Sequence, residues 1–417
     1  MKRTILTFVV LQFAAQFAFG QWVPQNSGTS QDFWAIDMAD GQVGFAGGGP
    51  WQFTSSCVIS KTEDGGQTWV AQNPVGFVSC IFGVDALNPD TIYAVGCNAS
   101  YYYGLILRSF NGGQTWTTKN ISNTWGFYCV EFPTESIGYT CGWNGRIYKT
   151  TNAGDTWTSL PSGSSQTFRR MCFVDENLGF AACGEDHATT NKIYKTINGN
   201  SWSLIKNFGS SFIIGGMYFF DEDTGVVVGT NGSKAVIKRT TDGGSNWEDV
   251  LEGNYTFALE CLDFDGDIGW AAGKYGSNNG IFRSEDGGQT WELHFSGLTG
   301  TPYSVVKRDT TSFIAGTSGM IMNYTESPPT QVRPLKMKDS MIYPNPADKS
   351  INININSFPE AKFYSITNCN GKLVHSSEIA RSDRIIIEVG DWKKGLYFLS
   401  VWSANKENMI TEKIIIN

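Results

Sequence analysis

Histidine is nearly missing from this chain, which has three in 417 residues. No cysteine pair or cysteine–histidine cluster has zinc spacing, so the sequence argues against a histidine-built or zinc site. Charged residues make up 17 % of the chain, the formal net charge is −8, and no basic run occurs. This acidic balance argues against nucleic acid or an anionic membrane as a partner. We expect no metal, no cofactor and no nucleic-acid partner.

Helical patterning is lacking as well, because no long stretch repeats apolar residues at i, i+3, i+4 and i+7. The 47 glycines and the aromatic content of 14 % suit short strands and tight turns. A length of 417 residues exceeds one ordinary domain. The sequence therefore predicts an all-β protein of two or more units.

The N-terminus carries the chain's one long apolar run. Lys2 and Arg3 precede the apolar stretch 5–19, so residues 1–20 are predicted to be a secretory signal peptide. A retained membrane anchor is the alternative, but the run is short and contains two glutamines. No later span of about twenty apolar residues occurs. We therefore expect an exported mature chain without a transmembrane span.

A short acidic motif, typified by KTEDGGQTW, occurs six times. Its closing tryptophans run from Trp69 to Trp291 in five intervals of about 44 residues, the length of a four-stranded propeller blade. The fourth copy is one residue shorter, which predicts a tighter turn. We call these segments the acidic turns; they are 61–69, 108–116, 149–157, 195–202, 239–247 and 283–291.

A second set of repeated segments lies upstream of the acidic turns and has seven members. These short apolar segments, bounded mostly by glycine, suit a strand buried between neighbouring blades. The missing seventh acidic turn is explained if residues 21–27 supply the outer strand of the last blade, with Trp22 as the seventh tryptophan. We therefore predict a seven-bladed β-propeller over 21–324. The seven segments are 44–48, 92–96, 138–142, 179–184, 225–229, 269–273 and 312–316.

The acidic turns follow the pattern Ser/Thr-x-Asp-x-Gly-x-x-Trp, as in Thr62, Asp64, Gly66 and Trp69. This pattern resembles the Asp-box (BNR) repeat, and the short blades resemble photosystem II stability/assembly factor-like propellers most. Asparagine replaces aspartate in some copies, which keeps the turn hydrogen bonds but removes the charge. We therefore interpret the turns as structural rather than catalytic or calcium-binding. The key residues are Asp64, Asn111, Asn152, Asn198, Asp242 and Asp286.

Function is expected on the face opposite the acidic turns. If the strands of each blade are named A to D from the channel outward, the B–C and D–A loops share that face, and variable loops commonly carry function. Aromatic faces there would stack on a glycan or anchor a protein, and arginine would bind a carboxylate or sulfate. Alternatively, the aromatics cap the ring and the arginines form salt bridges. The candidates are Trp51, Tyr101, Tyr102, Tyr103, Trp125, Phe168, Arg169, Arg170, His187, Tyr255, Lys274, Tyr275 and Tyr303.

A non-catalytic binding role is favoured over a glycoside hydrolase of the sialidase or xyloglucan-hydrolase type. Glycoside hydrolysis needs two carboxylates across the sugar. Glu185, Asp186, Glu260 and Asp37 are the nearest candidates, with Glu185 and Asp186 put first, but no motif selects them. No Arg-Ile-Pro segment occurs, which sialidases carry.

Nine cysteines in an exported chain predict some disulfides. Cys57 and Cys97 fall on the same face of adjacent blades and form the first candidate pair. Cys141 and Cys183 occupy equivalent strand-B positions in the third and fourth blades and form the second.

The C-terminal region reads as a polar linker, 325–340, followed by a separate domain, 341–417. Its alternating strands predict a small immunoglobulin-like β-sandwich. The domain resembles the type IX secretion (Por) C-terminal sorting domain of Bacteroidetes, which implies recognition by that machinery and a secreted or outer-membrane surface-attached product. A plain carbohydrate-binding sandwich is the alternative. The matching segments are 343–347, 370–372, 394–397 and 412–416.

Overall fold

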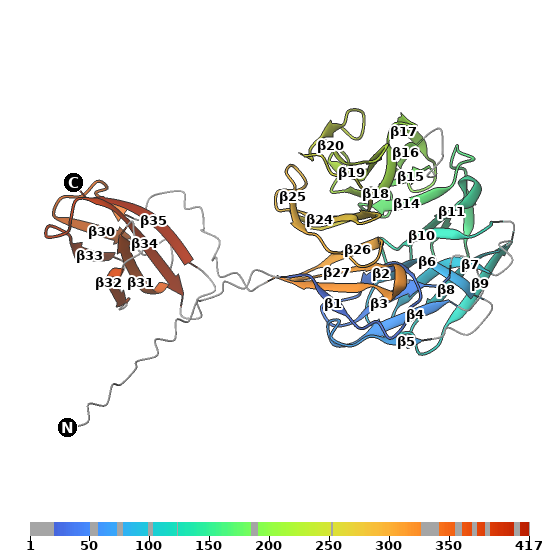
Figure 1. Ribbon diagram of the computed structural model, residues 1–417, viewed down its shortest axis with the longest axis horizontal. Coiled ribbons are helices and arrows are strands. Elements are labelled where there is room, and N and C mark those ends of the chain that lie inside the picture. The colour runs from blue at the N-terminus through green and yellow to red at the C-terminus, as the bar shows by residue number, and fades with distance from the viewer. Residues whose placement is uncertain are drawn as a thin grey trace, which may run out of the picture. The chain divides into compact units, whose positions relative to one another are not determined.

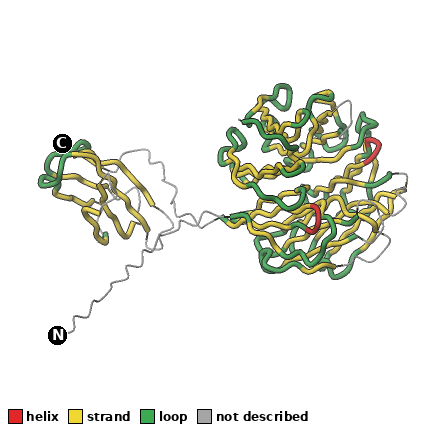
Figure 2. The backbone as a smooth tube through the Cα atoms, in the orientation of Figure 1, coloured by secondary structure: helices red, strands yellow, loops and turns green. Residues whose placement is uncertain are grey.

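The computed structural model divides into two compact units, residues 1–326 and 327–417. Its regular secondary structure is almost entirely strand, and two single turns of 3-10 helix, Trp143–Gly145 and Thr317–Gly319, are the helical segments among the described residues (Figure 2). No described helix is long and apolar enough to cross a membrane. The predicted signal peptide and residues 327–340 of the predicted linker lie outside the described residues. The structure describes 21–416 except 51–56, 73–77, 99–102, 123, 185–190, 252, 327–341, 355–360, 369–372, 380–383 and 404–408.

The first unit contains seven four-stranded antiparallel sheets arranged in a ring (Figure 1), and the cavity at the centre of this ring is its central channel. The innermost strand of each sheet contacts the innermost strands of its two neighbours, and the last contacts the first, so the ring closes. The predicted all-β propeller is thereby confirmed. The innermost strands are β2 (Phe33–Met38), β6 (Val78–Ala86), β10 (Phe127–Glu131), β14 (Phe168–Phe173), β18 (Ile213–Phe219), β22 (Leu259–Asp265) and β26 (Pro302–Arg308).

The second strands correspond to the Gly-bounded apolar segments, and most of their residues are buried because both faces pack against neighbouring sheets. They are β3 (Gly44–Gly48), β7 (Ile92–Asn98), β11 (Gly138–Gly142), β15 (Gly179–Cys183), β19 (Gly225–Asn231), β23 (Ile268–Tyr275) and β27 (Thr311–Gly316).

The third strands lead into the acidic turns in six sheets. They are β4 (Val58–Thr62), β8 (Tyr103–Ser109), β12 (Ile147–Thr150), β16 (Asn191–Thr196), β20 (Lys234–Thr240), β24 (Asn278–Ser284) and β28 (Ile321–Thr325). The outer strands follow the turns. They are β5 (Val70–Gln72), β9 (Thr117–Ser122), β13 (Thr158–Leu160), β17 (Ser203–Gly209), β21 (Glu248–Asp249), β25 (Glu292–Phe295) and, from the N-terminus, β1 (Val23–Gln25).

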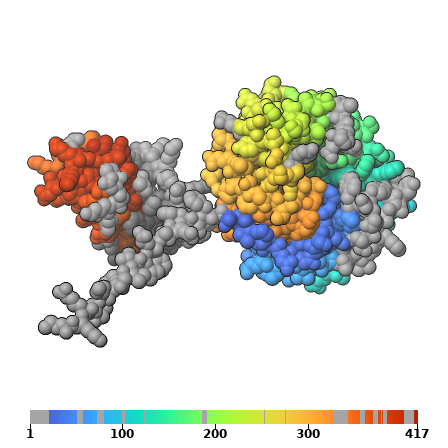
Figure 3. Space-filling model, viewed as in Figure 1, coloured from blue at the N-terminus to red at the C-terminus, as the bar shows by residue number. Residues whose placement is uncertain are grey.

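The N-terminal strand closes the ring as the sequence predicted. β1 pairs antiparallel with β28, with Val23 opposite Asn323, and blue N-terminal residues adjoin the orange last sheet in Figures 1 and 3. Trp22 is only 2 % exposed. Its ring lies edge-on to Trp270, with 5.0 Å between centroids, and 5.5 Å from Tyr324. The two ends of the propeller are therefore joined by strand pairing and by aromatic packing.

Each innermost strand carries a β-bulge at the same position, where one residue has no partner on the second strand. In six sheets the second strand has glycine at this level, because a side chain would strike the bulged strand. A Cβ on Gly96 would lie 1.8 Å from the carbonyl oxygen of Cys80, and one on Gly229 would lie 1.8 Å from that of Ile213. We call the seven extra residues the bulge ring: Trp34, Phe82, Tyr128, Arg169, Gly215, Glu260 and Tyr303.

The acidic turns are hydrogen-bonded hairpin connections. In the first turn the buried Thr62 hydroxyl accepts the N–H of Gly66 at 2.8 Å and donates to Asp64 at 2.9 Å. Asp64 in turn accepts the N–H and hydroxyl of Thr68, and these bonds hold the pKa of Asp64 below its usual value. Asn111 replaces the aspartate in the second turn and accepts the N–H of Thr115 in the same way. The short fourth turn is tighter, as predicted, because Asn198 accepts the N–H of Ser201, three residues further on, whereas Asp64 accepts the N–H of Thr68, four residues further on.

The hydrogen bonds of the first turn predict different effects on stability for two substitutions, Thr62→Ala and Asp64→Asn. Thr62→Ala should destabilise the propeller by about 1–2 kcal/mol, because the buried N–H of Gly66 would lose its acceptor. Asp64→Asn should leave stability close to wild type, because asparagine already makes the same backbone bond in other copies. Urea unfolding measures both variants, and equal losses would show that charge matters in the turn.

The second unit is a β-sandwich. One sheet contains β29 (Ile342–Tyr343), β30 (Ser350–Asn354) and β33 (Arg384–Glu388); the other contains β31 (Ala361–Asn368), β32 (Leu373–Glu378), β34 (Gly395–Ser403) and β35 (Met409–Ile416). A single core between them includes Ile351, Ile366 and Leu399. The side chain of Asn345 donates to the carbonyl of Lys413 and accepts the N–H of Ile415. The first and last segments of the predicted sorting domain thus meet at its C-terminal strand.

Candidate ligand site in the central channel

The channel contains a cavity of about 450 Å³, lined by residues from all seven innermost strands. We call the face opposite the acidic turns the loop face. The end of the cavity at this face is marked by Trp34, whose indole N–H donates to the carbonyl of Gly49 just after β3. Three residues further along β2, at about 10 Å for an extended strand, Asp37 lies toward the face of the acidic turns. The bulge lets both side chains face the cavity, because it shifts the alternation of the strand by one residue.

Five members of the bulge ring line the loop-face end and form an uninterrupted arc. Tyr303 stacks on Trp34 with 4.3 Å between ring centroids, and Trp34 lies edge-on to Phe82 at 6.0 Å. Phe82 contacts Tyr128 at 4.9 Å, and the guanidinium of Arg169 lies 5.4 Å from the centre of the Tyr128 ring. The arc presents four aromatic rings and one cation to the cavity.

Arg170 is hydrogen-bonded to the two bulge-ring residues that lie outside the arc, Gly215 and Glu260. Its Nε donates to the carbonyl of Gly215 at 2.7 Å, and one terminal nitrogen donates to the carbonyl of Glu260 at 3.0 Å. These carbonyls belong to the bulge residues of the two following sheets. Arg170 therefore holds three sheets together, and its hydrogen-bond donors are used for structure.

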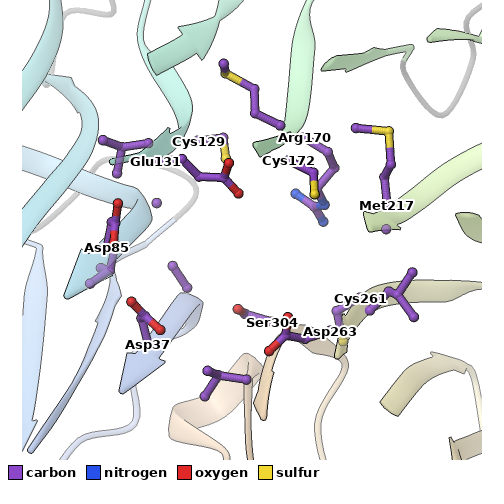
Figure 4. A pocket seen from close by; sticks show the side chains of 18 of the residues that line it. Asp37, Asp85, Cys129, Glu131, Arg170, Cys172, Met217, Cys261, Asp263 and Ser304 are labelled. Carbon is purple, nitrogen blue, oxygen red and sulfur yellow. The ribbon is translucent and has the colours of Figure 1, made fainter. Parts of the chain in front are cut away.

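Four carboxyl groups point into the cavity below the bulge ring (Figure 4). Each accepts a backbone N–H from the next sheet: Asp37 from Ala86 at 2.8 Å, Asp85 from Phe132 at 2.5 Å, Glu131 from Phe173 at 2.8 Å and Asp263 from Lys307 at 2.7 Å. The sulfur of Cys172 accepts the N–H of Phe219 at the equivalent position. These side chains link neighbouring sheets near the channel axis.

Burial raises the pKa of all four carboxyls, because desolvation disfavours the charged form. The pKa of Asp263 rises to about 7, and those of Asp85 and Glu131 rise well above their usual values, with the neighbouring carboxylates adding to the effect. Arg308 opposes the rise at Asp37, which it contacts at 3.5 Å.

The structure separates the predicted loop-face residues into three groups. Tyr303 and Arg169 lie at the two ends of the arc. Trp125, which is 44 % exposed with a positive φ of 61°, and Tyr103 lie at the surface. Lys274 donates to the carbonyls of Leu298 and Thr299, and Tyr255 packs on Phe282. The remaining predicted residues Trp51, Tyr101, Tyr102, Glu185, Asp186 and His187, and the side chain of Tyr275, lie outside the described residues.

Two sequence predictions are wrong. Phe168 is fully buried against Tyr194 and belongs to the core, because it precedes the bulge and points between sheets. The predicted disulfides are also absent from the described residues, since Cys57, Cys97, Cys141 and Cys183 are free thiols. The strand partner of Cys97 is Cys80, and that of Cys141 is Cys129, so the register opposes both predicted pairings. Burial raises the pKa of Cys57 and of Cys97 to about 12.

Trp34, Phe82 and Tyr128 were missed, and so were Asp85, Glu131 and Asp263. The aromatic residues share one position of the repeat, and the carboxyl residues share a second position three residues further along the innermost strands. Aligning these strands as FWAIDM, FYCVEF and LECLDF would have revealed both positions. Among the described residues no group of three or more histidine, cysteine, aspartate or glutamate side chains could hold a metal ion.

Family comparisons agree with this architecture. Residues 194–329 match the model of the photosynthesis system II assembly factor YCF48, and residues 341–417 match that of the secretion system C-terminal sorting domain. The chain joins a YCF48-like propeller to a secretion-system sorting domain. The sorting domain indicates type IX secretion to the cell surface or the extracellular space. The chain is thus a secreted protein carrying a YCF48-like propeller, and its resemblances to photosystem II assembly-factor propellers and to the secretion sorting domain are confirmed.

Solved structures share the fold of the YCF48-like propeller at low identity. A YCF48 bound to D1 peptide aligns with a TM-score of 0.58 and 19 % identity, over 73 % of this chain and 97 % of that one. YCF48 from Cyanidioschyzon merolae gives 0.55 and 17 %, over 73 % and 98 %. Virginiamycin B lyase from Staphylococcus aureus gives 0.57 and 13 %, over 74 % and 99 %. No curated protein matches the chain.

Proposed function

We propose that this protein is an exported, non-catalytic binding propeller that holds a polypeptide at the loop-face mouth of its channel. The observation that carries the proposal is the aromatic arc of the bulge ring, in which Tyr303, Trp34, Phe82 and Tyr128 lie side by side along the wall of the cavity. Bulges commonly re-aim side chains next to functional sites, and aromatic side chains dominate the energetics of protein interfaces.

Two further observations support a polypeptide over a glycan. The cavity has a cation, Arg169, at its rim and carboxyl groups beneath it, and polypeptides carry side chains of both signs. A propeller of the same fold is described as bound to D1 peptide. A glycan that stacks on the aromatic rings remains the alternative outcome of the test.

Export completes the proposal. Residues 1–20 act as the signal peptide, residues 325–340 as a linker, and the sorting domain engages the type IX machinery that releases the propeller or attaches it to the outer surface. The sorting tail supports this route.

Selection from a displayed library of random dodecapeptides, together with a glycan array, tests the function on the full exported chain. We expect peptides to be enriched, and Trp34→Ala to weaken an enriched peptide by about 30-fold, as for a central aromatic anchor. Phe110→Ala is the matched control, because Phe110 is an exposed aromatic in an acidic turn. Enrichment of glycans alone, or equal effects of the two substitutions, would contradict the proposal.

Hydrolysis is the second candidate, because Asp263 and its neighbours are carboxyls with raised pKa values in a cavity. Turnover of an arrayed polysaccharide, lost in Asp263→Asn or in Glu185→Gln, would establish it. The hydrogen bonds that each channel carboxyl makes to the next sheet favour a structural role instead.

A further inference from the structure

Arg169 is the cation of the bulge ring, and within the described part of the chain its hydrogen-bond donors are unused. Its guanidinium stacks on Tyr128 at 5.4 Å. Among the described residues the side chain makes no ion pair and no hydrogen bond, and its Nε is buried without a partner. Burying a charged donor without an acceptor lowers the stability of the folded state, and an acceptor supplied by a ligand would relieve this cost.

The two other arginines of the cavity are engaged. Arg170 donates to the carbonyls of Gly215, Glu260 and Arg169 itself. Arg308 donates to the carbonyl of Met38 and contacts Asp37. Arg169 is therefore the arginine of this cavity that remains available to a ligand.

The surroundings select the chemistry of that ligand. A guanidinium binds a carboxylate through two parallel hydrogen bonds, and here the guanidinium lies against the Tyr128 ring, which in turn packs on Phe82. The carboxyl groups of Asp85, Glu131 and Asp263 lie deeper in the same cavity and supply no positive charge for a second anion. The site suits one carboxylate held at the rim, beside apolar groups on the arc, and it disfavours polyanions.

We propose that Arg169 recognises a single carboxylate of the bound polypeptide, supplied by an aspartate or glutamate side chain or by a C-terminus. This inference rests on the proposed binding function and names its specificity-determining contact. The carboxylate accepts two hydrogen bonds from the guanidinium while the neighbouring part of the peptide packs on Trp34 and Tyr303. The same peptide without the carboxylate would keep the aromatic contacts and lose the charge-assisted pair.

Parallel selections of the dodecapeptide library on the full exported wild-type chain, Arg169→Gln and Arg169→Glu test this directly. Wild type should enrich peptides with an acidic residue or a free C-terminus near apolar residues. Arg169→Gln should lose that preference and weaken an enriched acidic peptide by about 10- to 100-fold, and Arg169→Glu should shift enrichment toward lysine and arginine. Synthetic versions of one enriched peptide, with Glu replaced by Gln or with a C-terminal amide, identify which carboxylate binds.

Arg146→Gln is the matched control, because Arg146 is an exposed arginine outside the cavity. Thermal unfolding of each variant checks folding. Peptide binding that depends on Trp34 but is unchanged by Arg169→Gln would overturn this inference and leave the proposed function standing. Absence of peptide enrichment by wild type would overturn both.

Discussion

Replacing Trp22 with alanine should destabilise the propeller by about 3–5 kcal/mol, the usual loss for a large buried aromatic. Trp22 is 2 % exposed and packs against Trp270 and Tyr324 from the sixth and seventh sheets. It also anchors β1, which supplies the outer strand paired with β28. Urea unfolding followed by tryptophan fluorescence measures the loss.

Val23→Ala is the control for this prediction. Val23 is the next residue of the same segment but is 49 % exposed, so its truncation should cost little, because exposed side chains gain little from folding. Deletion of residues 21–25 should cost at least as much as Trp22→Ala. A deletion variant as stable as wild type would show that the N-terminal strand does not close the ring.

Asp263→Asn should stabilise the propeller at pH 8 by on the order of 3 kcal/mol and change little at pH 4. The pKa of Asp263 is raised to about 7 by burial. Between about pH 4 and pH 7 the unfolded chain releases the proton while the folded chain keeps it, so wild-type stability falls as pH rises. Asparagine carries no charge and still offers an oxygen to the N–H of Lys307.

Urea unfolding of the propeller at several pH values tests that result. Asp267→Asn removes one negative charge from an exposed turn of the same sheet and should alter stability little at any pH. If Asp263→Asn were destabilising at both extremes of pH, the ionised carboxylate would be an essential acceptor and the assigned sign of the effect would be wrong.

Much of the propeller could be predicted because its elements repeat. Six acidic turns fixed the blade length, and seven buried glycine-bounded segments fixed the number of sheets. The count mismatch itself identified residues 21–27 as the missing outer strand, which β1 confirms. Repetition of this kind converts many weak local patterns into one strong prediction.

The candidate site was harder to predict because it depends on a one-residue shift of register. Without the bulge, Trp34 and Asp37 would lie on opposite faces of β2, so the alternating pattern alone hid their shared cavity. The same shift explains the error at Phe168, which directly precedes the bulge residue Arg169. In six sheets a second signal is the glycine at or near the end of the second strand, since it marks where the bulged backbone approaches.

The disulfide predictions were wrong for a related reason. Equivalent positions in adjacent blades suggested Cys57 with Cys97 and Cys141 with Cys183, but the strand register places Cys97 opposite Cys80 within one sheet. The thiols of Cys141 and Cys183 instead donate to nearby oxygens of Phe168 and Gln166. Register within a sheet, which the sequence pattern does not reveal, decides which sulfurs meet.

A crystal structure of the exported chain with one enriched acidic peptide would test the central claim most directly. The account predicts that the peptide lies at the loop-face mouth of the channel, on Trp34 and Tyr303, with one carboxylate on the guanidinium of Arg169. A peptide bound instead over the acidic turns, on the outer strands or on the sorting domain would contradict it.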